Sequence, residues 1–120
     1  MYQPSGRAAP VQEFMIALDL KLREKLLWQL FRLRTVHLAE LKEPHFKHFS
    51  IERYKELYEV REKGKMLVRI IFTIRSTGEI ILLHAFVKRK KRDTEQALEQ
   101  SLRILAELRA YPERAVEFKF

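Results

Sequence analysis

The strongest constraint on the fold is a series of three strand-like runs in the second half of the chain. They span residues 54–61, 66–75 and 79–88 and are rich in apolar side chains, many of them β-branched or aromatic. Gly64 and Gly78 lie in the two gaps between them, where glycine is typical of tight turns. Because short turns join antiparallel neighbours, the sequence predicts a small antiparallel sheet.

Two helices are predicted before this sheet. Pro10 suits the first position of a helix, and a second helix is predicted from about Asp19 to Leu41 because apolar residues keep a helical period there. Pro44 ends it, since the residue before a proline is pushed out of the helical conformation. The apolar residues of the two helices are Val11, Phe14, Met15, Leu18, Leu22, Leu26, Leu27, Leu30, Leu33 and Leu38.

A last helix follows the third run. It is predicted to begin at Asp93 or Thr94, since either residue could cap it, and to end before Pro112. Its apolar stripe is Leu98, Leu102, Leu105 and Leu108. Residues 115–120 could add a short tail strand. The order of elements predicts an α+β fold, with helices packed on a small twisted antiparallel sheet.

Length and composition limit the class of protein. A chain of 120 residues suffices for one ordinary domain but not for two, so we predict one domain over residues 1–120, with an extended lead-in over 1–9 and a tail over 111–120. No apolar run approaches the roughly 18 residues that span a membrane, and no secretory signal pattern is visible. The chain has no cysteine, which is compatible with a reducing compartment. We expect a cytoplasmic protein.

The charge favours a polyanionic partner. The net charge is +8, and residues 61–120 carry 14 Lys and Arg against 8 Asp and Glu. Residues 88–92 form an unbroken basic run, Lys-Arg-Lys-Lys-Arg. Such a surface favours nucleic acid, because phosphate contacts release bound counterions.

Alternation of apolar residues predicts the strand register. Even positions are apolar in residues 66–74, and odd positions are apolar in residues 81–87. A two-residue Thr-Gly turn pairs Ser76 with Glu79 and brings both apolar sets onto one face, which the helices are expected to cover. A slip of one residue would split the sets.

The other face of the sheet gathers charged side chains. In this register Arg69 lies opposite Phe86 on one side and Glu59 on the other. The candidate site residues on this face are Glu59, Arg61, Arg69, His84 and Lys88. A solvent-facing sheet surface with a cross-strand ion pair would need no function. The same face also holds Leu57, Ile71, Leu82 and Phe86. Large apolar side chains beside convergent charges favour a binding floor.

Two histidines raise the question of a metal. His45 and His48 are three residues apart in an ambiguous stretch that precedes the first run. No third ligand of a suitable type stands nearby in the sequence, whereas a zinc site needs three or four. We therefore predict no metal site and interpret both histidines as loop residues.

Four segments, taken together, match the pattern of a known family. Residues 57–61 are Leu-Tyr-Glu-Val-Arg, residues 68–70 are Val-Arg-Ile, and residues 82–89 are Leu-Leu-His-Ala-Phe-Val-Lys-Arg. Residues 10–14, Pro-Val-Gln-Glu-Phe, open the first helix. This series resembles the HigB-like branch of the RelE/ParE toxin superfamily, which is often of phage origin. The resemblance covers roughly residues 5–109. The family's usual first strand, before the helices, is not visible.

The resemblance implies ribosome-dependent cleavage of messenger RNA without a metal or cofactor, and an antitoxin partner, often a helix-turn-helix repressor. In such enzymes the RNA 2′-hydroxyl attacks the adjacent phosphate. Arg61 and Arg69 would then hold the scissile phosphate, and Lys88 would stabilise its added charge. Glu59 or His84 would serve as the general base or acid. The RNA backbone would be bound by Arg89, Lys90, Lys91 and Arg92.

Other interpretations stay open. A ParE-like toxin would share the fold but would poison DNA gyrase through contacts; the convergent acid and base residues argue against it, but fold alone cannot separate the two. A nucleic-acid-binding module without activity would use the basic run and would not need Glu59 or His84. A nuclear targeting signal at residues 88–92 is disfavoured by its position at a strand end.

Overall fold

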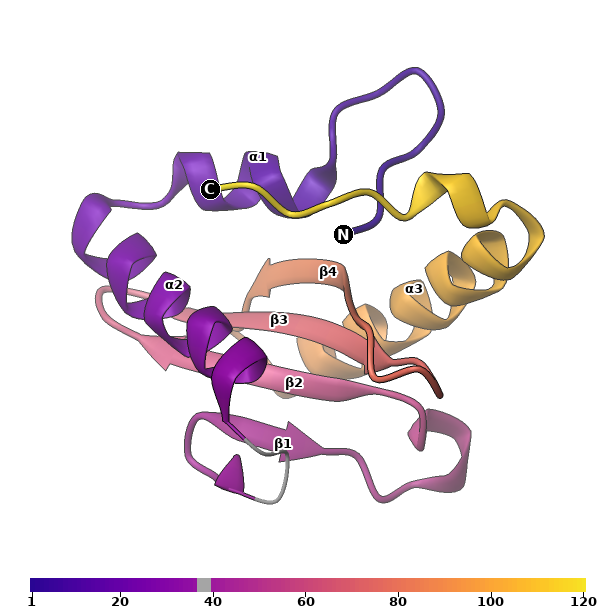
Figure 1. Ribbon diagram of the computed structural model, residues 1–120. Helices are drawn as coiled ribbons and strands as arrows, with labels where there is room; N and C mark the ends of the chain where they lie inside the picture. Colours follow the sequence, from indigo (N-terminus) through magenta and orange to yellow (C-terminus); the bar gives the residue numbers. More distant parts are fainter. Residues whose placement is uncertain (37–39) are drawn as a thin grey trace.

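The computed structural model, which describes residues 1–36 and 40–120, has a four-stranded antiparallel sheet with helices on both faces (Figure 1). The predicted α+β class is confirmed. The strands stand in the order β1-β2-β3-β4. In chain order the elements are α1 (Pro10–Ala17), α2 (Leu20–Thr35), β1 (Phe46–His48), β2 (Tyr58–Lys63), β3 (Leu67–Ile74), β4 (Ile80–Val87) and α3 (Lys91–Ala110). None of the helices in the described ranges has the length and apolar character needed to cross a membrane.

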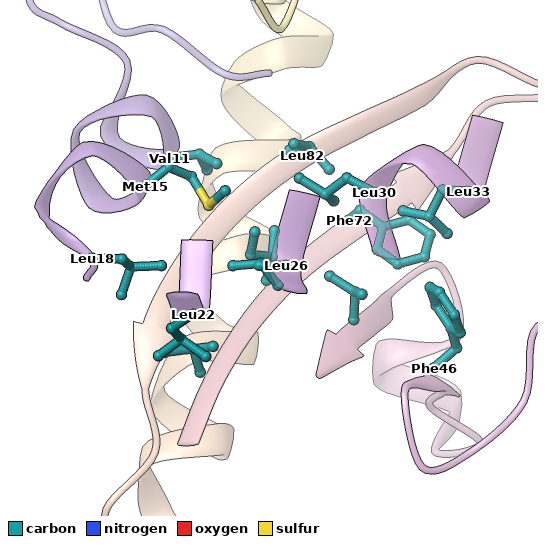
Figure 2. Close-up of a cluster of buried hydrophobic side chains, with 13 residues drawn as sticks. Val11, Met15, Leu18, Leu22, Leu26, Leu30, Leu33, Phe46, Phe72 and Leu82 are labelled. Atoms are coloured by element: carbon teal, nitrogen blue, oxygen red, sulfur yellow. The ribbon is translucent and has the colours of Figure 1, made fainter. Parts of the chain in front are cut away.

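Helices α1 and α2 cover one face of the sheet. Asp19 caps α2, because its carboxylate accepts a hydrogen bond from the Leu22 N–H at 3.0 Å. The apolar stripes of the two helices pack onto the sheet in a first cluster (Figure 2). Its buried members are Val11, Met15, Leu18, Leu22, Leu26, Leu30, Leu33, Phe46, Val60, Val68, Ile70, Phe72 and Leu82. The predicted helical stripes are therefore confirmed for these positions.

Helix α2 is shorter than predicted. It ends at Thr35 rather than near Leu41, and Val36 has an extended conformation. Two β-branched residues in a row disfavour helix, and the Thr35 hydroxyl donates to the Phe31 carbonyl at 3.1 Å. Leu38, a predicted apolar position of this helix, lies outside the described residues.

Helix α3 covers part of the other face. Its stripe packs with strand residues in a second cluster, whose buried members are Tyr2, Phe49, Tyr54, Leu57, Ile71, Ile81, Leu83, Ala97, Leu98, Ile104 and Leu108. The expectation that helices cover only one face is therefore wrong. Leu57 and Ile71, predicted for an open binding floor, are fully buried in this cluster.

The β3–β4 register is as predicted over residues 68–71 and changes beyond them. A bulge at Leu83 of β4, opposite the step from Ile71 to Phe72, makes Leu82 the partner of Phe72. Leu82 therefore packs with α1 and α2, whereas Ile81 and Leu83 pack on the α3 side. The prediction for these three β4 positions is wrong, because the bulge changes the face of the β4 residues between it and the turn relative to the predicted register.

The β3–β4 turn explains the offset. The Arg75 N–H donates to the Glu79 carbonyl and the Gly78 N–H to the Arg75 carbonyl, both at 2.8 Å. The loop thus has three residues, and Ser76 lies within it rather than opposite Glu79. Gly78 has φ +88, a conformation that glycine adopts without strain. The extra loop residue shifts the ladder by one, and the bulge restores it.

Strand β2 pairs with β3 two residues away from the predicted register. Arg61 lies opposite Arg69, and Glu59 lies opposite Ile71. Side chains alternate with a period of two, so an offset of two leaves each on its predicted face. The edge strand β1, which pairs with β2, comes from the stretch that the sequence left ambiguous.

The two ends of the chain run side by side next to β4 (Figure 1). The Tyr2 N–H donates to the Leu82 carbonyl at 3.0 Å, and the Gln3 N–H donates to the Arg114 carbonyl at 2.8 Å. The predicted tail strand is reduced to a single bridge between Tyr2 and Ala115.

Candidate functional site

Three rows of side chains cross β2, β3 and β4 on the face that carries α3. The first row is Glu59, Ile71 and His84; the second is Arg61, Arg69 and Phe86; the third is Lys63, Leu67 and Lys88. Lys88 lies beside Leu67 in the third row because its N–H donates to the Leu67 carbonyl at 2.8 Å. All five candidate site residues that the sequence placed on this face lie in these rows.

Glu59 contacts both arginines of the second row with a single carboxylate oxygen. It is only 1% exposed; its Oε1 accepts a hydrogen bond from Arg61 Nε at 2.7 Å and lies 3.5 Å from Arg69 Nε. Arg61 and Arg69 stand directly opposite each other, where like charges repel. The carboxylate offsets that repulsion, and one carboxylate between two guanidinium groups leaves a net positive charge.

Two polar atoms of this group have no hydrogen-bond partner within the described residues: Glu59 Oε2 and Arg69 Nε. Burial lowers the pKa of Arg69; Glu59 opposes this shift and Arg61 adds to it. A buried polar atom without a partner costs about 1–3 kcal/mol. An ordered water or a bound ligand would satisfy such atoms.

His84 and Phe86 lie next to each other on the same face of β4. Their rings stack with centroids 6.0 Å apart, and both residues are partly buried. Burial lowers the pKa of His84 below its ordinary value of 6.5, so the imidazole is neutral at pH 7. A neutral imidazole can accept a proton, and a partly exposed aromatic ring offers a surface for a base.

The basic run begins at the end of β4 and continues into α3. Lys88 is partly buried, and the exposed members of the run are Arg89, Lys90, Lys91 and Arg92. The backbone N–H groups of Arg89 and Lys90 donate to Asp93 Oδ2, both at 2.8 Å, and these bonds lower the pKa of Asp93. Asp93 therefore lies in the first turn of α3 as the third helical residue of a capping box rather than at the N-cap, which is Lys90, and the helix begins at Lys91, earlier than predicted.

The arrangement suits the binding of an anion. Paired guanidinium groups can bind several oxygens of one phosphate, and the amine of Lys88 lies one row further along the same face. Glu59 is buried and its contacts are with the arginines. Its environment therefore fits a residue that positions Arg61 and Arg69, more than one that reaches a substrate.

One contact of this site has no signal in the sequence. Arg61 Nη1 lies 3.7 Å from Glu43 Oε1, in the segment between α2 and β1. Glu43 has no pattern that relates it to Arg61, and only the packing of β1 against β2 brings the two together.

The paired histidines do not converge on a shared ligand. His45 Nδ1 lies 3.6 Å from Glu62 Oε2. His48 belongs to β1 rather than to a loop; its Nε2 lies 2.7 Å from the Lys55 carbonyl and its ring stacks on Tyr58. Among the residues that the structure describes, no group of three or more His, Asp or Glu could hold a metal ion.

Comparison with known proteins identifies a family. A model of phage-derived Gp49-like proteins (DUF891), a family of the RelE/HigB-like toxin type, matches residues 13–109. This range includes α2, the whole sheet and every candidate site residue. A search among curated proteins found no match.

Proposed function

We propose that this chain, which belongs to the Gp49-like family of phage-derived proteins, is the toxin of a type II toxin–antitoxin pair. On the ribosome it cleaves messenger RNA, as in the HigB-like branch that its strands resemble. The observation that carries the proposal is the opposed pair Arg61 and Arg69, which shares one buried carboxylate beside a neutral histidine. The family supports the class of protein, and this pair supports the class of reaction.

In this proposal Arg61 and Arg69 bind the non-bridging oxygens of the scissile phosphate. Glu59 offsets one of the two guanidinium charges, and Glu43 lies 3.7 Å from Arg61. Arg69 together with Lys88 therefore supplies the excess positive charge that attracts an incoming phosphate. Glu59 fixes both side chains and is a positioning residue, which assigns the acid–base role to His84.

His84 removes the proton of the 2′-hydroxyl, and the 2′-oxygen forms a bond to the adjacent phosphorus. The bond from phosphorus to the 5′-oxygen of the next nucleotide breaks, leaving a 2′,3′-cyclic phosphate and a 5′-hydroxyl. Lys88 stabilises the additional charge and supplies the proton that the leaving oxygen takes up. Phe86, next to Arg69 and stacked on His84, offers a ring for a flanking base.

The proposed function also implies partners and a location. Messenger RNA and the ribosome are the substrate complex, and Arg89, Lys90, Lys91 and Arg92 contact RNA backbone near it. An antitoxin, of the helix-turn-helix repressor kind, blocks the toxin until it is needed. The site of action is the bacterial cytoplasm, where ribosomes translate.

The test is induced expression in a bacterial host, with messenger RNA ends mapped over the first minutes. Wild type is compared with Arg69→Ala and with Arg75→Ala, a matched loss of an exposed arginine that is paired with Glu79 outside the site. We expect new cuts inside translated frames for wild type and Arg75→Ala, and none for Arg69→Ala. Circular dichroism of the purified variants establishes that each one folds.

Two results would contradict the proposal. Growth arrest without new RNA ends would move the target away from messenger RNA, with gyrase as the next candidate. Full cleavage by a folded Arg69→Ala protein would remove the activity from this face of the sheet.

A further inference from the structure

The third row of the site continues onto a positively charged end of the sheet. We call this the basic end and define it by seven cations from two segments: Lys63, Lys65, Lys88, Arg89, Lys90, Lys91 and Arg92. The Lys88 N–H donates to the Leu67 carbonyl, and Leu67 pairs with Lys63. The β2–β3 turn and the basic run are thus neighbours in space, although they are distant in the sequence.

The β2–β3 turn is held in place by α2, whose first turns lie beside it (Figure 1). A Cβ atom on Gly64 would lie 3.4 Å from the side chain of Leu22, and Lys25 Nζ donates to the Lys63 carbonyl at 2.7 Å. The exposed side chains of Lys63 and Lys65 therefore extend from a fixed backbone.

The charges of the basic end are not neutralised within the described part of the chain, where none of the seven cations forms an ion pair with a carboxylate. By contrast, four arginines elsewhere are paired with carboxylates: Arg53 with Glu99, Arg75 with Glu79, Arg109 with Glu56 and Arg114 with Glu107. Asp93, which follows the run, uses its Oδ2 to accept backbone N–H groups. Unpaired cations keep their full attraction for an external polyanion.

We infer that the cations of the basic end other than Lys88 bind the phosphate backbone of RNA outside the cleavage site, with Lys63 and Lys65 as contacts in addition to residues 89–92. This inference deepens the proposed function and rests on it for the identity of the polyanion. The third row adjoins Arg61 and Arg69, so a strand that leaves the proposed cleavage site past Lys88 meets Lys63 next. Flexible cationic side chains contact phosphates irrespective of base sequence.

The test is a salt titration of binding with the purified full chain. The probes are a fluorescein-labelled 2′-O-methyl RNA hairpin and a single strand of equal length, both without the attacking hydroxyl; anisotropy is measured from about 50 to 200 mM KCl. Lys63→Gln/Lys65→Gln is expected to reduce the slope of log Kd against log salt by about 1.8 on the hairpin and about 1.4 on the single strand, because each phosphate that is no longer neutralised lowers the slope by about 0.9 for a duplex and about 0.7 for a single strand.

A matched control removes two charges outside the basic end. Arg7→Gln/Lys119→Gln changes two exposed cations of the lead-in and the tail, and we expect its slope to equal that of wild type. If both double variants lower the slope equally, the RNA is attracted by the overall charge of +8 rather than by the basic end. That result would overturn the inference. Absence of binding by wild type would overturn it as well.

Competition identifies the class of partner. If polyglutamate displaces the RNA as effectively as unlabelled RNA does, the surface suits an acidic protein and the inference fails. A slope that is smaller for Lys63→Gln/Lys65→Gln than for wild type, on either the hairpin or the single strand, supports the inference. The probe on which wild type has the steeper slope identifies the form of RNA that the basic end prefers. If the double variant lowers the slope on the hairpin but expression of wild type produces no cuts in messenger RNA, the inference that the basic end binds RNA is supported. The proposed ribonuclease activity is then contradicted.

Discussion

Glu59 links the stability of the sheet to the geometry of the proposed phosphate site. One of its oxygens contacts both Arg61 and Arg69, and the other has no hydrogen-bond partner within the described residues. A buried carboxylate is stable only when cations and hydrogen bonds compensate for its lost hydration. The three residues therefore act as one electrostatic unit, and a change in one alters the orientation of the other two.

Glu59→Gln removes the charge and keeps the shape of the side chain. We expect it to lower the free energy of unfolding by roughly 1.5–3 kcal/mol, the range for hydrogen bonds that involve a charged group, and to weaken cleavage in the expression assay. Urea denaturation measures the first effect. Glu56→Gln, at a half-exposed carboxylate paired with Arg109, is the control and should change stability by less than about 1 kcal/mol. Equal effects of the two substitutions would mean that Glu59 does not anchor the arginines.

Burial of His84 makes part of the stability depend on pH. Its pKa is below 6.5 in the folded protein, so the unfolded chain takes up the proton more readily. The contribution of neutral His84 to the free energy of unfolding is complete above about pH 6.5. It is lost as the pH falls from there toward the pKa of His84 in the folded protein. Between about pH 7.5 and pH 5, wild type should therefore lose more unfolding free energy than His84→Gln. Parallel curves from urea denaturation would show that burial of His84 does not disfavour its charged form.

At the scale of elements, Gly78 sets the offset between β3 and β4 through its positive φ. Gly78→Ala is expected to cost about 1–2 kcal/mol of unfolding free energy, because a Cβ atom is strained in this conformation. Gly64→Ala is the matched control, since Gly64 is not among the glycines with positive φ and its Cβ would make only an ordinary contact with Leu22. A shift of less than about 0.5 kcal/mol is expected for it. The strain argument fails if urea denaturation gives the two variants the same stability.

Local patterns were enough to predict the three helices, the strands β2 to β4 and the faces of the β2 and β3 residues, but not the strand β1 or the faces of Ile81, Leu82 and Leu83. Alternation assigned Glu59, Arg61 and Arg69 to one face, and this assignment survived an error of two residues in the β2–β3 register because side chains alternate with a period of two. The three-residue turn and the bulge at Leu83 could not be predicted, since they depend on how two strands close on one another.

The burial of the candidate site residues could not be predicted from the sequence either. The stripe of α3 is a local pattern, but its position over Leu57 and Ile71 follows from the path of the chain after β4. That position decides how much of the face is covered. The burial of Glu59, on which its proposed positioning role rests, therefore follows from tertiary packing.

At the scale of the whole molecule, one sheet supports two apolar clusters. Phe72 and Leu82 belong to the cluster under α1 and α2, whereas Ile71 and Leu83 belong to the cluster under α3. Because adjacent residues of the same two strands supply both clusters, the loss of one cluster removes support from the other. We therefore predict that residues 1–120 unfold cooperatively as one domain.

Leu83→Ala tests this coupling, because Leu83 is fully buried on the α3 side while the single tryptophan, Trp28, lies on α2. Removing the side chain should cost about 2–5 kcal/mol. If the domain is cooperative, the urea midpoints from Trp28 fluorescence and from far-UV circular dichroism fall together. Ile51→Ala, at an exposed position, should shift neither midpoint appreciably. A Trp28 transition that stays at the wild-type midpoint while the dichroism shifts would mean that the α1–α2 layer unfolds independently of α3.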